Sequence, residues 1–185
     1  MEEGHERGGN IMTGFKRDRG KKIALGGVVS GLSIVSLYLA AILPTNRLLF
    51  FALSSIFIAA VVIEYGVSPA FATYIAISVL GLVLVPNKLM MNPYIFFFGY
   101  YGIIKYYIEK KNRFILAWLI KIILFNAALW IMYATAKVFI AQNIVNEYGL
   151  LMVAVLAQVA FIAYDIGYTA AISYYRKNIR SRLKK

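Results

Sequence analysis

Cysteine is absent from the 185-residue chain, and histidine occurs once, as His5. Without cysteine the chain forms no disulfide and no thiolate metal site, and it has no thiol for redox chemistry. His5 stands in a polar stretch with no second ligand beside it. The sequence therefore predicts neither a metal centre nor a cofactor.

Acidic residues are scarce too, because eight Asp and Glu stand against 20 Lys and Arg and leave a formal net charge of +12. These basic residues gather at the ends of apolar segments rather than along one soluble face. Such a distribution is typical of the loops and ends of membrane spans and not of a surface that binds nucleic acid, so we expect no nucleic-acid partner.

Catalytic and nucleotide-binding motifs are also missing. The sequence contains no Gly-x-Ser-x-Gly, no paired carboxylates within an apolar segment and no Gly-x-x-x-x-Gly-Lys-Ser/Thr loop. We therefore expect a protein that is not an enzyme and that does not itself use ATP.

Apolar residues are what the chain has in abundance: 61% of it is hydrophobic, and its mean hydropathy is +0.70. This apolar surface exceeds what one soluble domain of the same size buries, so lipid must cover the rest. Six apolar runs are each near the length that crosses a hydrocarbon core of about 30 Å. They cover residues 23–43, 48–63, 67–85, 93–108, 114–140 and 148–175.

Backbone groups in lipid must be paired within their own segment, and none of the runs alternates as a barrel strand does. The sequence therefore predicts an all-α polytopic membrane protein, a six-helix transmembrane bundle over residues 23–175. Residues 1–22 are expected to form a disordered basic cytoplasmic tail, and residues 176–185 a second basic cytoplasmic tail.

The positive-inside rule orients this bundle. Both termini and the loop after the fourth run are rich in Lys and Arg, whereas the opposite loops hold only Arg47 and Lys88. We expect both termini in the cytoplasm and the chain in a cell membrane, the plasma membrane of a prokaryote.

A charged side chain at the middle of a span costs about 2.5–3.5 kcal/mol, so each one is a candidate functional residue. Lys121 and Asp165 lie at comparable depths in the fifth and sixth runs and are predicted to form an intramembrane ion pair. Such a pair is either a structural lock or part of an ion or proton relay. Lys105, one turn from the cytoplasmic end of its run, is expected to snorkel.

Polar and aromatic residues on the outer half of the bundle form the predicted substrate pocket. On the fifth run they recur at helical spacing along one face, and further members come from the other runs and the outer loops. Single Tyr and Trp residues also form interfacial belts, and amides also bond between helices, so a structural role stays open. The residues are Asn46, Arg47, Lys88, Tyr94, Asn126, Trp130, Tyr133, Lys137 and Gln158. The cationic members favour an anionic or neutral ligand over a cationic one.

The first run is rich in small residues and contains Gly27-x-x-x-Gly31. A face of this kind lets a second helix approach closely, so Gly27 and Gly31 are the predicted partner contact.

Six spans, basic cytoplasmic termini, Gly27-x-x-x-Gly31 and a Pro-containing outer loop after the first run together resemble the S component of energy-coupling factor (ECF) vitamin transporters. The family often has Ala-x-x-x-Ala at this glycine motif. The resemblance implies a subunit that captures a vitamin-like small molecule near the outer face and works with a T component and two cytoplasmic ATPases. Two alternatives stay open: a non-catalytic accessory or assembly subunit of a membrane complex, and a small secondary transporter or channel.

Overall fold

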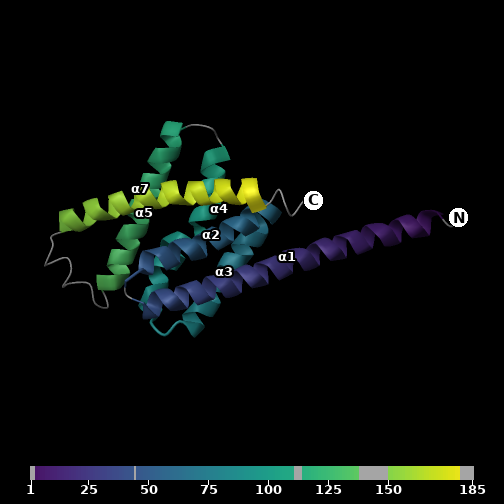
Figure 1. The fold of residues 1–185 in the computed structure, drawn as a ribbon, viewed down its shortest axis with the longest axis horizontal. Helices are drawn as coiled ribbons and strands as arrows, with labels where there is room; N and C mark the ends of the chain where they lie inside the picture. The colour runs from purple at the N-terminus through teal and green to yellow at the C-terminus, as the bar shows by residue number, and fades with distance from the viewer. Residues whose placement is uncertain (1–2, 44, 111–113, 138–149, 180–185) are drawn as a thin grey trace.

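The computed structural model describes residues 3–43, 45–110, 114–137 and 150–179, which form a bundle of helices (Figure 1). No β-strand occurs in these ranges, and the all-α prediction is confirmed. The α-helices are α1 (Glu3–Ile42), α2 (Arg47–Tyr65), α3 (Val67–Leu84), α4 (Gly99–Lys110), α5 (Phe114–Lys137) and α7 (Leu150–Tyr174).

Five helices of the described chain are long and apolar enough to cross a membrane. They correspond to the first, second, third, fifth and sixth predicted runs. The fourth run forms a π-helical turn, η2 (Tyr94–Phe98), that leads directly into the 12 residues of α4. The length and apolar composition of these helices therefore support a helical membrane protein. The helix of the fourth run is shorter than the others.

The N-terminal segment differs from its prediction, because α1 is a 40-residue helix that already begins at Glu3. Residues 3–22 are thus helical, although a disordered tail was expected. Extending an existing helix gains one hydrogen bond per residue without a new nucleus, so an apolar span can propagate into a polar flank. Figure 1 shows this part of α1 projecting beyond the rest of the bundle.

The start of α1 and the end of α7 lie at the same end of the molecule in Figure 1. A chain whose ends share one side of a membrane crosses it an even number of times, whereas five described helices have the length and composition of a span, so six crossings stay a prediction. The break between the fifth and sixth runs, at residues 138–149, lies outside the described residues, as do residues 180–185 of the basic tail.

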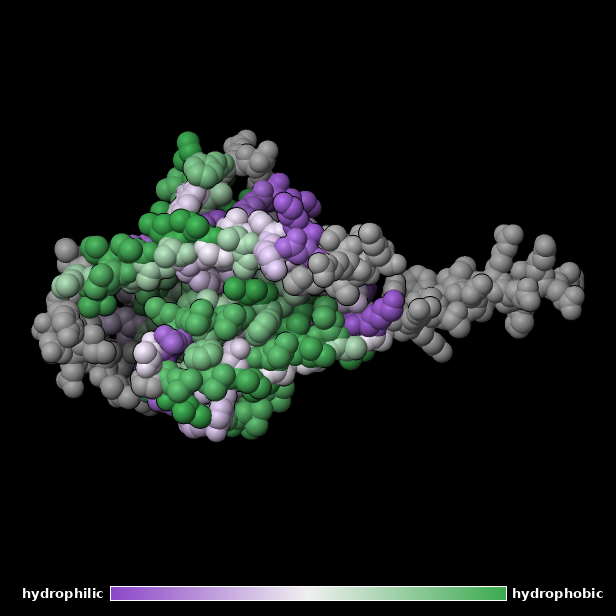
Figure 2. Space-filling view, in the orientation of Figure 1, coloured by the Kyte–Doolittle hydropathy of each residue, from purple (hydrophilic) through white to green (hydrophobic). Residues whose placement is uncertain are grey.

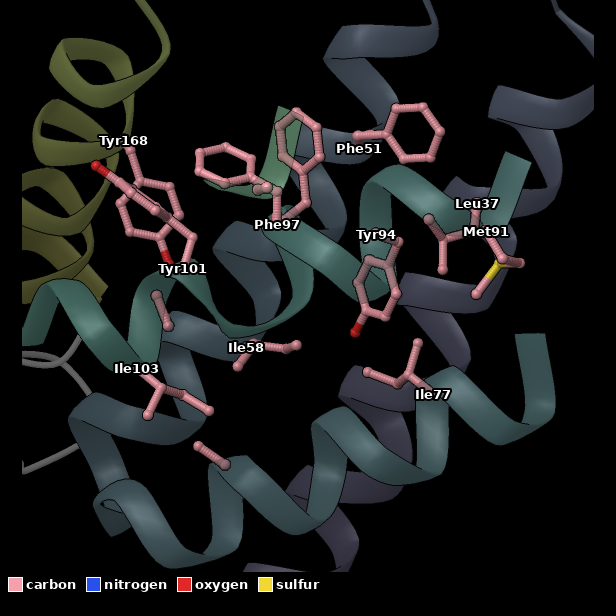
Figure 3. Packing of buried hydrophobic residues seen from close by; sticks show 14 of the residues in the cluster. Leu37, Phe51, Ile58, Ile77, Met91, Tyr94, Phe97, Tyr101, Ile103 and Tyr168 are labelled. Atoms are coloured by element: carbon pink, nitrogen blue, oxygen red, sulfur yellow. The ribbon is translucent and has the colours of Figure 1, made fainter. Parts of the chain in front are cut away.

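Aromatic rings fill the middle of the bundle (Figure 3). Phe97 of η2 contacts Phe125 of α5 and Phe161 of α7, at centroid distances of 5.2 and 5.8 Å. Phe125 and Phe161 stack on each other at 4.4 Å with an interplanar angle of 12°. This stack joins α5 to α7 where, in Figure 1, the two helices cross rather than run side by side.

The outer surface of the bundle is apolar. Figure 2 shows hydrophobic residues covering most of the visible face, and Val83 and Phe114 are among the most exposed side chains, at 71% and 77%. In water such a surface would aggregate, whereas in a bilayer it contacts acyl chains.

Candidate functional site: a buried ring of four charged side chains

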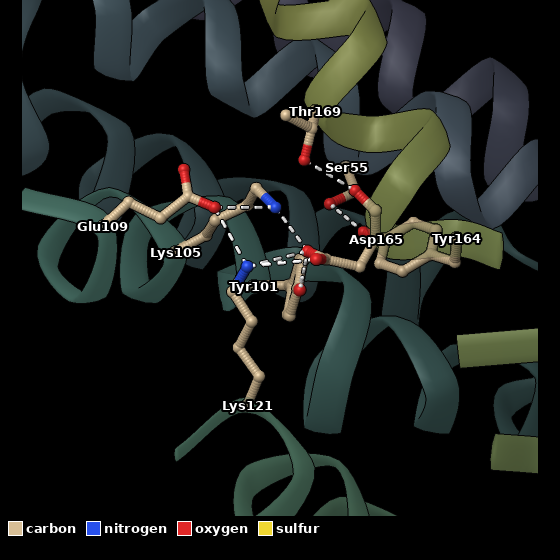
Figure 4. Close-up of polar contacts among 8 residues, drawn as sticks. All are labelled: Ser55, Tyr101, Lys105, Glu109, Lys121, Tyr164, Asp165 and Thr169. Carbon is tan, nitrogen blue, oxygen red and sulfur yellow. Dashed lines mark hydrogen bonds and ion pairs between the residues drawn. The ribbon is translucent and has the colours of Figure 1, made fainter. Parts of the chain in front are cut away.

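The charged residues inside the bundle meet where three helices come together. Lys105 and Glu109 are four residues apart on α4 and so share one face of that helix. Lys121 comes from α5 and Asp165 from α7. The crossing of these helices turns residues far apart in the sequence into neighbours (Figure 4).

The four side chains form a closed ring in which cations and anions alternate. Glu109 Oε1 lies 3.0 Å from Lys105 Nζ and 2.9 Å from Lys121 Nζ. Lys121 Nζ lies 3.0 Å from Asp165 Oδ2, and Asp165 Oδ1 closes the ring by pairing with Lys105 Nζ. The predicted pair of Lys121 and Asp165 is thus in contact, within a larger group.

Burial makes this ring costly to disrupt. Lys105, Asp165 and Lys121 are 1%, 3% and 4% exposed, whereas the Glu109 side chain is 44% exposed. Two ammonium groups face two carboxylates, so the ring has no net charge when all four are ionised. Removing one member of such a buried group leaves an uncompensated charge in a medium of low dielectric constant.

Lys105 differs from its prediction, since it was expected to snorkel to the cytoplasmic surface. Its ammonium group instead points into the bundle, toward Glu109 and Asp165. A buried carboxylate on a neighbouring helix gives the lysine a better-satisfied position than the headgroup region does.

A tyrosine hydroxyl group and aromatic side chains surround the four charged residues. The Tyr101 hydroxyl donates a hydrogen bond to Asp165 Oδ1, so this carboxylate accepts from three side chains. Lys105 Nζ lies 5.9 Å from the ring centroids of Tyr101 and Tyr168, and Lys121 Nζ lies 5.6 Å from that of Trp118. These aromatic faces supply further negative potential to the ammonium groups.

Two tyrosines of α7 fix that helix against α2. Tyr164 donates to Ser55 Oγ at 2.9 Å, and Tyr168 donates to the Ser55 carbonyl at 3.2 Å. Asp165 lies between these residues in the sequence, so the bonds to Ser55 also fix its position.

A cavity of about 610 Å³ opens beside the ring, among α4, α5 and α7. Glu109, Lys121 and Asp165 lie in its wall together with the hydroxyl residues Thr169 and Ser173. A second cavity of about 110 Å³ adjoins Lys105 and Arg176 on the side of α2, and Glu109, Thr169 and Ser173 line both. The ring therefore separates two spaces and contributes charged groups to each.

The described residues of the predicted outer pocket do not converge on one site. Asn126 and Gln158 lie in contact, with Gln158 Nε2 donating to Asn126 Oδ1 at 2.8 Å. Trp130 and Tyr133 are 72% and 37% exposed and face the outside of the bundle. The side chain of Lys137 lies outside the described part of the structure.

The remaining predicted pocket residues have separate positions. Asn46 is the exposed N-cap of α2, and Arg47 begins that helix. Lys88 Nζ donates to the carbonyls of Val83 and Val85, each at 3.2 Å, and so caps the end of α3. Tyr94 is fully buried, and its hydroxyl has no hydrogen-bond partner among the described residues.

The predicted partner contact on α1 is open. Gly27 and Gly31 are both exposed, and a Cβ atom added to either would meet nothing within 4 Å. No other helix of the described chain occupies this face.

Glu109 is the ring member to which the sequence analysis assigned no role. Its spacing of four residues from Lys105 was a signal for an ion pair on one helix face. Its proximity to Lys121 depends on how α4 and α5 pack, which no local pattern encodes.

The described residues contain no group of three or more His, Cys, Asp or Glu that could hold a metal ion. A scan against known protein families finds no match, and comparisons with curated proteins and with solved structures find none that is significant.

Proposed function

We propose that this chain is the membrane-embedded substrate-capture subunit of an ECF-type transporter in a prokaryotic plasma membrane. It binds a vitamin-like small molecule, anionic or neutral, and depends on a T component and ATPase subunits for the energy of transport. The apolar, helical character of the molecule supports a role within the bilayer.

The observation that carries this proposal is the open face of α1. Gly27 and Gly31 lie one helical turn apart, and neither is covered by another part of the described chain. In a membrane, helices associate through close backbone contact rather than through a hydrophobic driving force. A small-residue face left uncovered on α1 is therefore suited to a helix from a partner subunit.

Copurification tests this assignment. Gly27→Leu combined with Gly31→Leu should abolish copurification with a T component, because the added side chains hold the partner helix away. The matched control is Val79→Leu combined with Val83→Leu, which enlarges two exposed residues of α3 at the same spacing. Retention of the T component by the glycine variant, or its absence from the wild-type preparation, would overturn the proposal.

The second candidate is an accessory or assembly subunit without a captured substrate. The outward orientation of Trp130 favours it, since this residue was expected to line an outer pocket. Mass spectrometry of the purified chain distinguishes the two candidates. A capture subunit retains a stoichiometric small molecule, whereas an accessory subunit copurifies with protein partners alone.

A further inference from the structure

We propose that the cavity among α4, α5 and α7 binds an amphiphilic oxyanion, a phosphate or carboxylate carried on an apolar body. The bound oxyanion takes the position of the Glu109 carboxylate and bridges Lys105 and Lys121. Its identification as the transported cargo rests on the proposed function, whereas its binding is a property of this chain alone.

The two carboxylates of the ring differ in how firmly they are held. Asp165 is buried and accepts hydrogen bonds from Lys105, Lys121 and Tyr101. Glu109 is 44% exposed, and it meets both lysines through Oε1 alone. Figure 4 shows its other oxygen pointing away from the two ammonium groups. Glu109 is therefore the member that a competing anion can displace at the lower cost.

Charge balance explains why the displacing group must be an anion. Lys105 and Lys121 are almost fully buried, and Asp165 neutralises only one of them. If Glu109 turns outward, one positive charge stays in a low-dielectric site without a partner. A phosphate or carboxylate oxygen restores the pairing through charge-assisted hydrogen bonds to the same two ammonium groups.

The cavity accommodates such a ligand. Its volume of about 610 Å³ lies within the range of about 300–1,000 Å³ typical of small-molecule sites. Lys121 and Ser173 offer donors at its polar wall. Phe114, Ile166 and Ala170 supply an apolar wall. A ligand with a charged head group and an apolar body matches this combination of a polar wall and an apolar wall.

An oxyanion on an apolar body can come from either of two sources, an anionic lipid or a water-soluble amphiphile. The intramembrane cavity and the exposed apolar side chains of α5 near Phe114 suit a ligand with an acyl chain. The experiment below separates the two sources.

The two tryptophans of the chain provide a built-in reporter. Trp118 lines the cavity and lies over Lys121, while Trp130 is exposed on the outer half of α5. Trp130→Phe thus leaves Trp118 as the single tryptophan of the chain. In phosphatidylcholine nanodiscs, titration with octyl phosphate should change its emission saturably, and the uncharged octyl glucoside at equal concentration should not.

Variants in this Trp130→Phe background test the role of Glu109. Glu109→Gln should tighten octyl phosphate binding by about tenfold or more, because the competing internal anion is gone. Glu109→Gln with Lys121→Met should lose binding, yet it keeps the neutral pair of Lys105 and Asp165 and so stays folded. Lys22→Met removes an exposed lysine of α1 that lies outside the cavity, and it should leave the affinity unchanged. Unchanged or weaker binding by folded Glu109→Gln would overturn the proposal.

Nanodisc composition identifies the source of the anion. If the natural ligand is a lipid, phosphatidylglycerol discs should shift the Trp118 emission by themselves and compete with octyl phosphate. If it is a soluble amphiphile, octyl phosphate should bind equally well in both kinds of disc. No response of Trp118 in either disc would refute the site, whether or not a T component binds the chain.

Discussion

Asp165→Asn is the substitution that tests the electrostatic account of the ring most directly. It keeps the shape of the side chain and removes the charge that pairs with Lys105 and Lys121. The ring then carries two ammonium groups and the single carboxylate of Glu109, which is half exposed. Because breaking a buried ion pair in this way costs about 3–5 kcal/mol, the variant should be destabilised by that amount.

A compensating substitution separates charge from shape. Lys121→Met in the Asp165→Asn background restores neutrality, because Lys105 and Glu109 remain as a pair at 3.0 Å. The double variant should therefore lose less than the sum of the two single costs, by about 1–3 kcal/mol. Thr169→Val is the control, since the Thr169 hydroxyl donates only to the backbone carbonyl of Asp165, at 2.8 Å.

Reversible denaturation in mixed micelles with increasing SDS, followed by circular dichroism, measures these free energies. The cycle needs the wild type, both single variants and the double variant under one set of conditions. Additive costs would refute the account, because they would mean that Lys121 and Asp165 do not interact. An Asp165→Asn variant as stable as Thr169→Val would refute it as well.

Three further predictions concern packing and topology. Gly102→Ala should lower stability by about 1–3 kcal/mol, because its Cβ would overlap the Tyr168 hydroxyl, whereas Gly27→Ala has open space and should be nearly neutral in the same denaturation assay. Tyr94→Phe should leave stability unchanged or raise it, since it removes a buried hydroxyl that lacks a partner among the described residues; a large loss would contradict this. Tags at residues 1 and 185 should be labelled only from the cytoplasmic side, and labelling of either from outside intact cells would overturn the six-span topology.

The sequence predicted the helices well because hydropathy and length decide where a chain crosses a bilayer. The short gap between the second and third predicted runs, residues 64–66, corresponds to a real helix boundary. Gly66 has φ +86°, a left-handed conformation that links α2 to α3 in a single-residue turn. A residue with a side chain would be strained there, so the glycine marked the reversal.

The helix boundary at the N-terminus was harder to predict. Charge and glycine content suggested a disordered segment before residue 23, but α1 begins at Glu3. Composition describes how an isolated segment behaves, whereas this one is attached to a helix that the membrane span already nucleates.

The predicted outer pocket shows why residue spacing along one helix does not by itself predict contacts between helices. Asn126, Trp130 and Tyr133 do share a helical face, yet Asn126 contacts Gln158 of α7 whereas Trp130 is 72% exposed. Because α5 crosses α7, contact is confined to the crossing, and the face beyond it turns away from the bundle. Residue spacing fixes the face of a helix, but the crossing geometry fixes what that face meets.

The same crossing gives the charged ring its functional interest. Contacts between α5 and α7 include the Phe125–Phe161 stack, the Asn126–Gln158 hydrogen bond and the ion pair of Lys121 with Asp165. Lys121 also pairs with Glu109 of α4. The stack is apolar and indifferent to ligands, whereas the ion pairs respond to any charge that enters the adjacent cavity. In the binding mode that we propose, an oxyanion that replaces Glu109 bridges Lys105 of α4 and Lys121 of α5, so the link between these two helices then passes through the ligand. The contact between α4 and α5 would therefore depend on whether the Glu109 carboxylate or the bound oxyanion pairs with the two lysines.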